Sequence, residues 1–576
     1  MYKLIIIVLM LIYNISAEAL LTVGGDNACD YLSLQQAINQ SADGEEIRIS
    51  GSALFENIVI NDRSVKLVGG YDNCNKAELN ISNGLLAAVD GQDMGSVITI
   101  TGQQTHSNVL LENLFIGNGL ETGNGRAGGV AIYLADADIT LNNTRVAFNY
   151  SEQFGGGVGV YLGNVNLTLN NSHINDNQTA SNGAGLHCSG VNSQVSILGS
   201  SEIYNNRAID GDSLGGGVYL TNFCEADFFA PVKIHNNKVR NYFTDGGVNT
   251  GGGAFAVVNR AQLDIHPYYW CVPLGGCLFT NAPVVISGND AVKGSVAYVK
   301  DAKVNFTNVK IINNKKSNPD HWKVSSLIWA QSSGIETSFS SRSKNPKECN
   351  DPDGCHLYKA NEAQKFVVAG VDTIVNIEGA NLSNNVMRSF LASNGEVTVG
   401  NSFITDNSFL GLSQGFDLQT TGQLYFTNNT MANNVFESLD DAYNLFSGGA
   451  QSYVQVYGSI INENTNVSIA SESKLGNYYF RCLLVHDQNS IPGVNNNIKE
   501  ADPLFMDSDN GDYRLKGGSL AIDFCQDYLP SYTYSTDFGG ELRGWDDPAV
   551  NNYAGPYDVG ADESYQNDII FDDSFE

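Results

Sequence analysis

Three charged residues in one short stretch are the first candidates for chemistry. Arg207 precedes Asp210 by three positions and Asp212 by five. Clustered Asp carboxylates can hold a calcium ion, and a basic side chain beside them can abstract a proton from a carbon next to a carboxylate. The flanking Asn205 and Asn206 indicate a turn between strands, and a solvated turn explains the same three residues equally well.

Aromatic residues on inserted segments form a second candidate group. They are Tyr268, Tyr269, Trp270 and Trp322. Such rings can stack on sugar rings and so bind a glycan. The alternative is that they anchor the inserted segments to the body of the protein.

No further motif predicts a metal or a cofactor. The stretch from Asp507 to Asp512 begins like a calcium loop, but Gly511 and Gly518 stand where an EF-type loop needs an oxygen ligand and a Glu. A tight turn at Asn510-Gly511 explains it better. The eight His residues are scattered, and surface or core positions are their default interpretation. We therefore predict no metal site and no cofactor, and calcium is the one ion that the acidic groups would accept.

These side chains must be positioned by a repeated unit. Between about residues 128 and 314, Gly pairs or triplets open short apolar strands, and each unit closes on Ile-x-x-Asn. The openings include GGVAIYL, GGGVGVYL and GGGAFAVV, and the closing units include Ile174 with Asn177 and Ile203 with Asn206. A period of about thirty residues is typical of a solenoid, in which each repeat buries its apolar face on the next. Alternation of apolar and polar residues favours three strands in each coil.

The Asn residues of the turns have a predicted role. Asn tolerates the left-handed backbone conformation, and its amide can bond its counterpart one coil away to form a ladder. The N-x-S/T triplets at Asn142, Asn166, Asn170 and Asn305 are therefore interpreted as turn residues rather than glycosylation acceptors.

The pattern changes at both ends and at two internal places. Residues 1–19 have one Lys, a short apolar run and Ala-x-Ala, the pattern of a cleaved secretory signal. Residues 20–57 contain a short amphipathic helix carrying Leu34, Ala37 and Ile38, which we interpret as an N-terminal cap. The predicted β-solenoid covers residues 58–500, with inserted loops at 259–281 and 315–366. Residues 501–563 form a separate C-terminal cap region, and 564–576 a tail.

Ten cysteines in an exported chain favour disulfides. Their spacings suggest five pairs, which are Cys29 with Cys74, Cys188 with Cys224, Cys271 with Cys277, Cys349 with Cys355, and Cys482 with Cys525.

A formal net charge of −31 argues against nucleic acid as a partner, because binding phosphates needs a basic surface. After the signal, the sequence has no stretch of about twenty apolar residues, so we predict no transmembrane helix. We expect a monomer that is secreted or held at the outer cell surface.

The repeats resemble known families. The coils resemble the right-handed parallel β-helix of pectate-lyase-like proteins. The Gly-Gly openings alternating with Ile-x-x-Asn are similar to the repeats of chlamydial polymorphic outer membrane proteins. ADPLF (501–505), NGDYRL (510–515), GSLAID (518–523) and YDVGADE (557–563) are similar to the choice-of-anchor Q region of bacterial exported proteins. The terminal IIFDDSFE resembles a short sorting end, with Ser574 in place of its Gly.

These resemblances imply an all-β fold, a right-handed parallel β-helix with an N-terminal helical cap and a C-terminal cap region. They favour a non-enzymatic, adhesin-like protein that binds an extracellular polysaccharide or a surface protein. The alternative is a polysaccharide lyase or hydrolase of the pectate-lyase-like fold. The combined Asn-Thr-Asp, Asp-Asp, Gly-His-Gly and Arg-Ile-Lys set of hydrolases of this fold is missing from the sequence. Arg207, Asp210 and Asp212 would be the catalytic candidates of that alternative.

Overall fold

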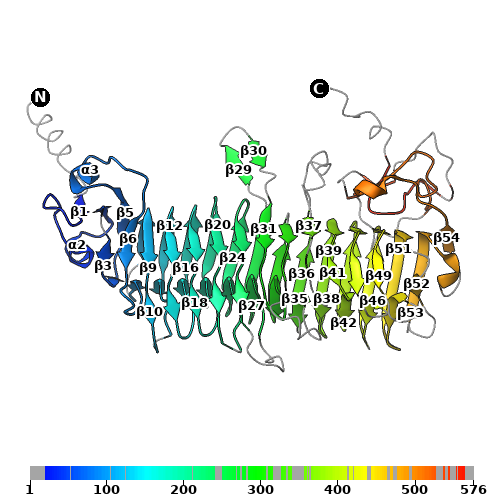
Figure 1. Ribbon diagram of the computed structural model, residues 1–576, viewed down its shortest axis with the longest axis horizontal. Helices are drawn as coiled ribbons and strands as arrows, with labels where there is room; N and C mark the ends of the chain where they lie inside the picture. The colour runs from blue at the N-terminus through cyan, green and yellow to red at the C-terminus, as the bar shows by residue number, and fades with distance from the viewer. Residues whose placement is uncertain are drawn as a thin grey trace, which may run out of the picture.

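Parallel strands stack into one long rod (Figure 1). The computed structural model describes residues 20–564 except 52, 104–105, 124, 211, 241–249, 267–268, 273–275, 280–282, 307–308, 316–325, 332–334, 340–355, 360, 362–364, 411–413, 420, 438–442, 464–466, 471–476, 492–495, 527–535, 539–541, 545–552 and 554. The predicted all-β parallel β-helix is confirmed. The predicted signal segment, residues 1–19, lies outside the described residues.

Each coil contributes a strand to each of several stacks. The first stack, a 14-stranded sheet, contains β4 (Ile58–Asn61), β7 (Ile98–Thr101), β11 (Val130–Tyr133), β15 (Val158–Val160), β19 (Leu186–Cys188), β23 (Val218–Leu220), β27 (Phe255–Val258), β32 (Ala297–Lys300), β35 (Ser326–Gln331), β38 (Lys365–Ala369), β42 (Ser389–Ser393), β46 (Gln414–Leu418), β50 (Tyr443–Gly448) and β52 (Val467–Ala470).

Two further stacks belong to the largest sheet. One contains β1 (Leu21–Val23), β2 (Glu45–Ser50), β5 (Val65–Tyr71), β8 (Ser107–Glu112), β12 (Ala137–Asn142), β16 (Val165–Asn170), β20 (Gln194–Leu198), β24 (Glu225–Phe229), β28 (Gln262–His266), β33 (Lys303–Phe306), β36 (Ile335–Phe339), β39 (Thr373–Glu378), β43 (Glu396–Gly400), β47 (Gln423–Thr427), β51 (Tyr453–Asn462), β53 (Asn477–Val485) and β54 (Asn496–Glu500). The other contains β3 (Leu54–Phe55), β6 (Ala87–Asp90), β9 (Leu114–Gly117), β13 (Arg145–Ala147), β17 (His173–Asn175), β21 (Glu202–Tyr204), β25 (Lys233–His235), β31 (Val284–Ser287), β34 (Val309–Ile312), β37 (His356–Lys359), β40 (Ala380–Ser383), β44 (Phe403–Thr405) and β48 (Thr430–Ala432).

Very short strands follow the second of these stacks around a bend. They are β10 (Leu120–Glu121), β14 (Tyr150–Ser151), β18 (Gln178–Thr179), β22 (Arg207–Ala208) and β26 (Lys238–Val239), and later β41 (Val386–Met387), β45 (Ser408–Leu410) and β49 (Val435–Glu437). The stacks enclose the core because alternate residues point inward. In β12, for example, Ile139 and Leu141 are buried and lie beside Leu167 and Leu169 of the next coil.

A ladder of buried Asn side chains runs along the bend. Each Nδ2 donates to the Oδ1 of the Asn one coil later at 2.9–3.1 Å, and each such Oδ1 also accepts the backbone N–H of the preceding Asn. The members are Asn149, Asn177, Asn206, Asn237, Asn289, Asn314, Asn361, Asn385, Asn407 and Asn434. The predicted ladder is therefore confirmed.

One detail of the ladder prediction is wrong. The left-handed conformation belongs to the residue before each ladder Asn, such as Asp176 (φ 56°), Asn205 (φ 56°) and Asn236 (φ 55°). That residue makes the turn, and the Asn after it points its amide into the core. Two adjacent positions thus divide the roles that the sequence assigned to one.

The N-x-S/T asparagines are also corrected. Asn142, Asn166, Asn170 and Asn305 lie in strands rather than turns, on the outer face of β12, β16 and β33. They pair with neighbouring coils: Asn170 Nδ2 donates to Asn142 Oδ1 at 3.0 Å, and Asn166 Nδ2 donates to Asp138 Oδ1 at 2.8 Å.

The N-terminal end combines the expected helix with strands that were not expected. Helix α2 (Leu34–Gln40) begins at Ser33, whose hydroxyl accepts from the N–H of Gln36, and it buries Leu34, Ala37 and Ile38. Strands β1 and β2 already belong to the large sheet, so the stacking starts at Leu21 rather than at residue 58. Helix α3 (Cys74–Glu78) lies beside them.

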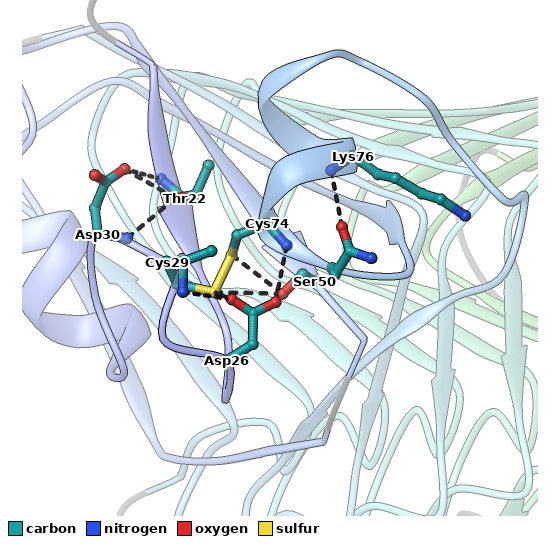
Figure 2. Close-up of a disulfide and its surroundings, with 9 residues drawn as sticks. Thr22, Asp26, Cys29, Asp30, Ser50, Cys74 and Lys76 are labelled. Carbon is teal, nitrogen blue, oxygen red and sulfur yellow. Dashed lines mark hydrogen bonds between the residues drawn. A yellow bond between two sulfur atoms is a disulfide. The ribbon is translucent and has the colours of Figure 1, made fainter.

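A disulfide joins Cys29 to Cys74, and Figure 2 shows that Asp26 supports it. The Asp26 carboxylate accepts the backbone N–H of Ala28 at 2.8 Å and of Cys74 at 3.1 Å. Cys188–Cys224 and Cys482–Cys525 are also bonded. Cys271 and Cys277 are backbone partners in the antiparallel hairpin of β29 (Tyr269–Val272) and β30 (Gly276–Phe279), while Cys349 and Cys355 lie outside the described residues.

Each of the two predicted insertions contains strands of the coils within its described residues. Residues 315–366 contain β35, β36 and β37, which pair on both sides with strands of neighbouring coils. Residues 259–281 contain β28, and the β29–β30 hairpin is the part that stands off the rod (Figure 1).

The C-terminal region lies against the side of the last coils (Figure 1). Its hairpin of β55 (Phe505–Asp507) and β56 (Asp512–Leu515) joins Ala521, Phe524 and Val559 in a second apolar cluster with Tyr457, Ile460 and Leu484. The N–H of Gly560 donates to the carbonyl of Gly458 at 2.8 Å, and that of Ala561 donates to Thr430 Oγ1 at 3.0 Å. Within the described residues, no helix is long and apolar enough to cross a membrane.

A buried His gives the rod a predicted acid sensitivity. His187 stacks between Tyr161 and Tyr219, at 5.3 Å from each ring, and burial lowers its pKa from 6.5 to about 3. Unfolded protein binds a proton there below pH 6.5 but folded protein does not, so stability falls as pH drops from 6.5 toward 3. We expect His187→Phe to remove this loss and to move the midpoint of acid unfolding, followed by circular dichroism, to lower pH. The exposed His106→Asn is the control, and equal midpoints for H187F and the unmodified protein would contradict the prediction.

Candidate functional site

The predicted catalytic residues do not form a compact site. Arg207 opens the short strand β22 and is half-buried, whereas Asp210 and Asp212 are exposed on the segment that follows. Among the described residues, no ion pair joins Arg207 to either carboxylate. The solvated-turn interpretation accounts for this arrangement.

The side chains of the four predicted aromatic residues lie outside the described part of the structure. Tyr268 and Trp322 lie outside the described residues. Tyr269 and Trp270 belong to β29, of which the backbone alone is described.

A carboxylate cluster that the sequence did not indicate lies on the outer face of β24 and β28. The side chains of Asp227, Asp264 and His266 offer ligand atoms within 4.8 Å of one another. His266 Nε2 lies 2.9 Å from Asp227 Oδ1, a hydrogen bond that raises the pKa of His266 and lowers that of Asp227. Amides of Gln194 and Asn305 donate to the carboxylates as well. These contacts account for the cluster as an internally paired group.

The most unusual exposed residue is Phe148. Its backbone is left-handed (φ 60°), and 53% of its surface is exposed. The equivalent bend residues of other described coils are Asn118, Asp176, Asn205, Asn236, Gly288, Asn313, Asn384, Asp406 and Asn433. A bulky residue in this conformation costs about 1 kcal/mol or more, and such strain persists mainly where it serves a function.

Phe148 completes an aromatic platform around one guanidinium. Its ring centroid lies 6.4 Å from that of Phe115. The Arg145 guanidinium carbon lies 5.5 Å from the Phe148 ring and 5.8 Å from the Phe115 ring. Arg145 Nε also donates to Asn175 Oδ1 at 2.9 Å, which fixes its orientation.

The same face continues over the next coils as a row of paired polar groups. Glu202 accepts from Lys233 Nζ at 2.9 Å and lies 3.4 Å from His235 Nε2 and 4.0 Å from His173 Nδ1. The Tyr204 and His235 rings stack at 4.9 Å. We call the set Phe115, Arg145, Phe148, His173, Glu202, Tyr204, Lys233 and His235 the Phe148 face.

The charges of the Phe148 face are balanced. Burial opposes ionisation of Glu202, but hydrogen bonds from Lys233 and His235 outweigh it and lower its pKa. Burial lowers the pKa of His173, so that ring is neutral near pH 7. Arg145 has the Asp176 carboxylate 3.8 Å from one guanidinium nitrogen. Arg145 and Lys233 are thus matched by Glu202 and the neighbouring Asp176, so their formal charges sum to zero in a chain with a net charge of −31.

The sequence does contain a signal for this site. Val146-Ala-Phe148-Asn149 is a closing unit with Val in place of Ile, and its third position carries Phe where the other units carry a turn residue. Comparison with protein-family models and with curated proteins finds no match for this chain.

Proposed function

We propose that the protein is an exported, non-enzymatic β-helix that binds a glycan along the Phe148 face. The repeats and the C-terminal motifs that resemble bacterial surface proteins support display at, or release from, the cell surface. The exposed, strained Phe148 carries the proposal, because 53% of its surface stays exposed although its ring packs beside Phe115 and Arg145, and an Asn or Gly would fill this turn position without strain.

The composition of the face suits an uncharged glycan. Aromatic rings such as Phe148 cover the apolar faces of sugars, and paired planar groups offer donors and acceptors to hydroxyls. Strands β9 to β25 span four coil steps of about 4.8 Å, or roughly 19 Å, the length of a few sugar units. Its balanced charges make a polyuronate a poorer ligand than a neutral polysaccharide.

The enzymatic alternative rests on Glu202. A hydrolase needs a second carboxylate that acts as acid or base across the scissile bond. Asp176, the other carboxylate beside this face, is engaged by Asn175 Nδ2 at 2.5 Å and by Arg145. Both carboxylates are thus held by protein donors, which favours binding over turnover.

The variant Phe148→Asn tests the proposal. Asn tolerates the left-handed conformation, so we expect the variant to gain about 1 kcal/mol in stability while its affinity for a neutral polysaccharide falls at least tenfold. Stability is measured by chemical denaturation, and affinity by retention on immobilised neutral and uronate polysaccharides with and without calcium.

Phe223→Asn is the matched control. Phe223 is also left-handed (φ 64°) and 45% exposed, and Arg260 lies over its ring, but it belongs to another corner of the coil. The F223N variant should gain folding stability and keep the full affinity for the neutral polysaccharide. Unchanged affinity of F148N would contradict the proposal, and release of cleaved sugar by the unmodified protein would establish the lyase or hydrolase alternative.

A further inference from the structure

A cavity of about 410 Å³ lies where the C-terminal region meets the last coils. Phe436, Asn462 and Glu463 line it from the coils, and Phe505, Ser508 and Tyr513 line it from the C-terminal hairpin. Strands β49 and β51, which contribute to its wall, lie far along the rod from β9, where the Phe148 face begins (Figure 1). The cavity has no part in the proposed function.

Glu463 is the acidic end of the Asn ladder. Asn434 donates its backbone N–H to Glu463 Oε2 at 2.9 Å and its Nδ2 to Glu463 Oε1 at 2.6 Å. Every ladder amide donates toward the C-terminus, so the last one needs a group that accepts. Glu463 is 6% exposed, and its side chain closes the wall of the cavity.

The carboxyl of Glu463 has no cationic partner in the cavity wall. Among the described residues that line the cavity, none is Lys or Arg. A second carboxylate lies close by, since Tyr513 donates its hydroxyl to Asp406 Oδ1 at 2.7 Å and Asn433 Nδ2 lies 2.6 Å from the same oxygen. Burial, opposed by the bonds from Asn434, raises the pKa of Glu463 from 4.5 to about 8, so at pH 7 this carboxyl is mostly protonated.

Three aromatic residues, Phe436, Phe505 and Tyr513, form part of the wall. The Phe505 and Tyr513 rings meet edge to face with centroids 5.2 Å apart, and the Phe436 ring stacks on Phe409 at 4.7 Å. Aromatic faces beside a carboxylate attract cations, most strongly where water is excluded. The strongly acidic protein raises the local concentration of cations further.

We propose that this cavity binds an organic cation, a primary or quaternary ammonium group, with Glu463 as its counter-ion. Binding displaces the carboxyl proton of Glu463 to the solvent, and the ligand's positive charge then balances the carboxylate. The Asn434 donors hold that carboxylate in place.

Isothermal titration calorimetry of the full mature chain tests this proposal. The probes are propylammonium and tetramethylammonium chloride, with 1-propanol as the neutral analogue and calcium chloride as the metal. At pH 7 we expect an ammonium probe to bind and to release close to one proton, which is measured by comparing buffers of different ionisation enthalpy. Affinity should fall about tenfold for each unit that pH drops below 7, because the proton competes with the cation.

Glu463→Gln keeps an acceptor for Asn434 but cannot ionise, so it should lose at least tenfold in ammonium affinity and all proton release. Glu437→Gln, an exposed carboxylate at the end of β49, is the matched control and should bind as the unmodified protein does. Circular dichroism verifies that both variants fold. Equal binding of 1-propanol, preference for calcium, absence of ammonium binding, or unchanged binding by E463Q would each overturn the proposal.

Discussion

Replacing Asn237 by Ala should lower the free energy of unfolding by about 4 kcal/mol or more. Asn237 Oδ1 accepts the backbone N–H of Asn206 at 3.1 Å and its Nδ2 at 3.0 Å. Asn237 Nδ2 donates to the carbonyl of Ile203 at 2.9 Å and to Asn289 Oδ1 at 3.1 Å. Ala leaves the backbone N–H and one of the two Nδ2 hydrogens of Asn206 buried without acceptors, while the other Nδ2 hydrogen keeps the carbonyl of Ile174. Each unpaired donor costs about 1–3 kcal/mol. Chemical denaturation measures the change.

Asn236→Gly is the control beside it. Asn236 is exposed and left-handed (φ 55°), a conformation that Gly adopts without strain. We expect a change within about 0.5 kcal/mol. If N237A and N236G were equally stable, the ladder would be a passive consequence of stacking rather than a main source of stability.

Raising the pH from 5 to 9 should destabilise the C-terminal half of the rod. The pKa of Glu463 is about 8 in the folded protein against 4.5 as its ordinary value, so the folded state binds the proton more tightly. The stabilisation is complete below pH 4.5 and is lost as pH rises through 8, a loss on the order of 5 kcal/mol. Asp406, Tyr513 and the Asn434 amide lie close to this carboxyl, and His486 Nδ1 accepts the backbone N–H of Glu463.

Glu463→Gln should flatten a large part of this dependence, measured as denaturation midpoints at several pH values. Part of the slope should remain. Burial also raises the pKa of Glu563 to about 7, and it raises that of Asp558, where the charge of Glu563 adds to the effect. Identical slopes for E463Q and the unmodified protein would refute the assignment, and E437Q again serves as the control.

Much of the fold can be predicted from the sequence because the same pattern of apolar, Gly and Asn residues recurs in many coils. Gly-led openings such as Gly215–Leu220 coincide with strands of one stack, and helix α2 covers the predicted end. The pairing of Cys29 with Cys74, which the cysteine spacing suggested, is confirmed. The coil within 315–366 escaped prediction because its strands carry neither a Gly pair nor the closing motif; His356–Lys359, for example, is found by its pairing with β34 and β40.

The candidate sites were harder to predict because they depend on departures from the repeat. Phe148 is a candidate because of its left-handed backbone conformation. Glu463 is a candidate because it accepts the last bonds of a ladder of ten Asn side chains. Neither property can be recognised from the residue type alone. The different roles of Asn236, which makes the turn, and Asn237, which joins the ladder, likewise cannot be told from the sequence, because two adjacent Asn residues are identical there. The cavity brings together segments about 80 residues apart, from Phe436 to Tyr513, whose contact no local pattern encodes.

The ladder also limits where whole coils can be added to or removed from the protein during evolution. Successive members are separated by 28, 29 and 31 residues in the first coils, and each receives and passes on the same bonds. An in-frame duplication or loss of one such unit between Asn149 and Asn434 would leave both ends of the chain of amides as they are. A unit added after Glu463 would meet a carboxyl whose two oxygens already accept from Asn434, and no side-chain amide is there to continue the ladder. Recombination can therefore lengthen the ladder before Glu463 but not after it.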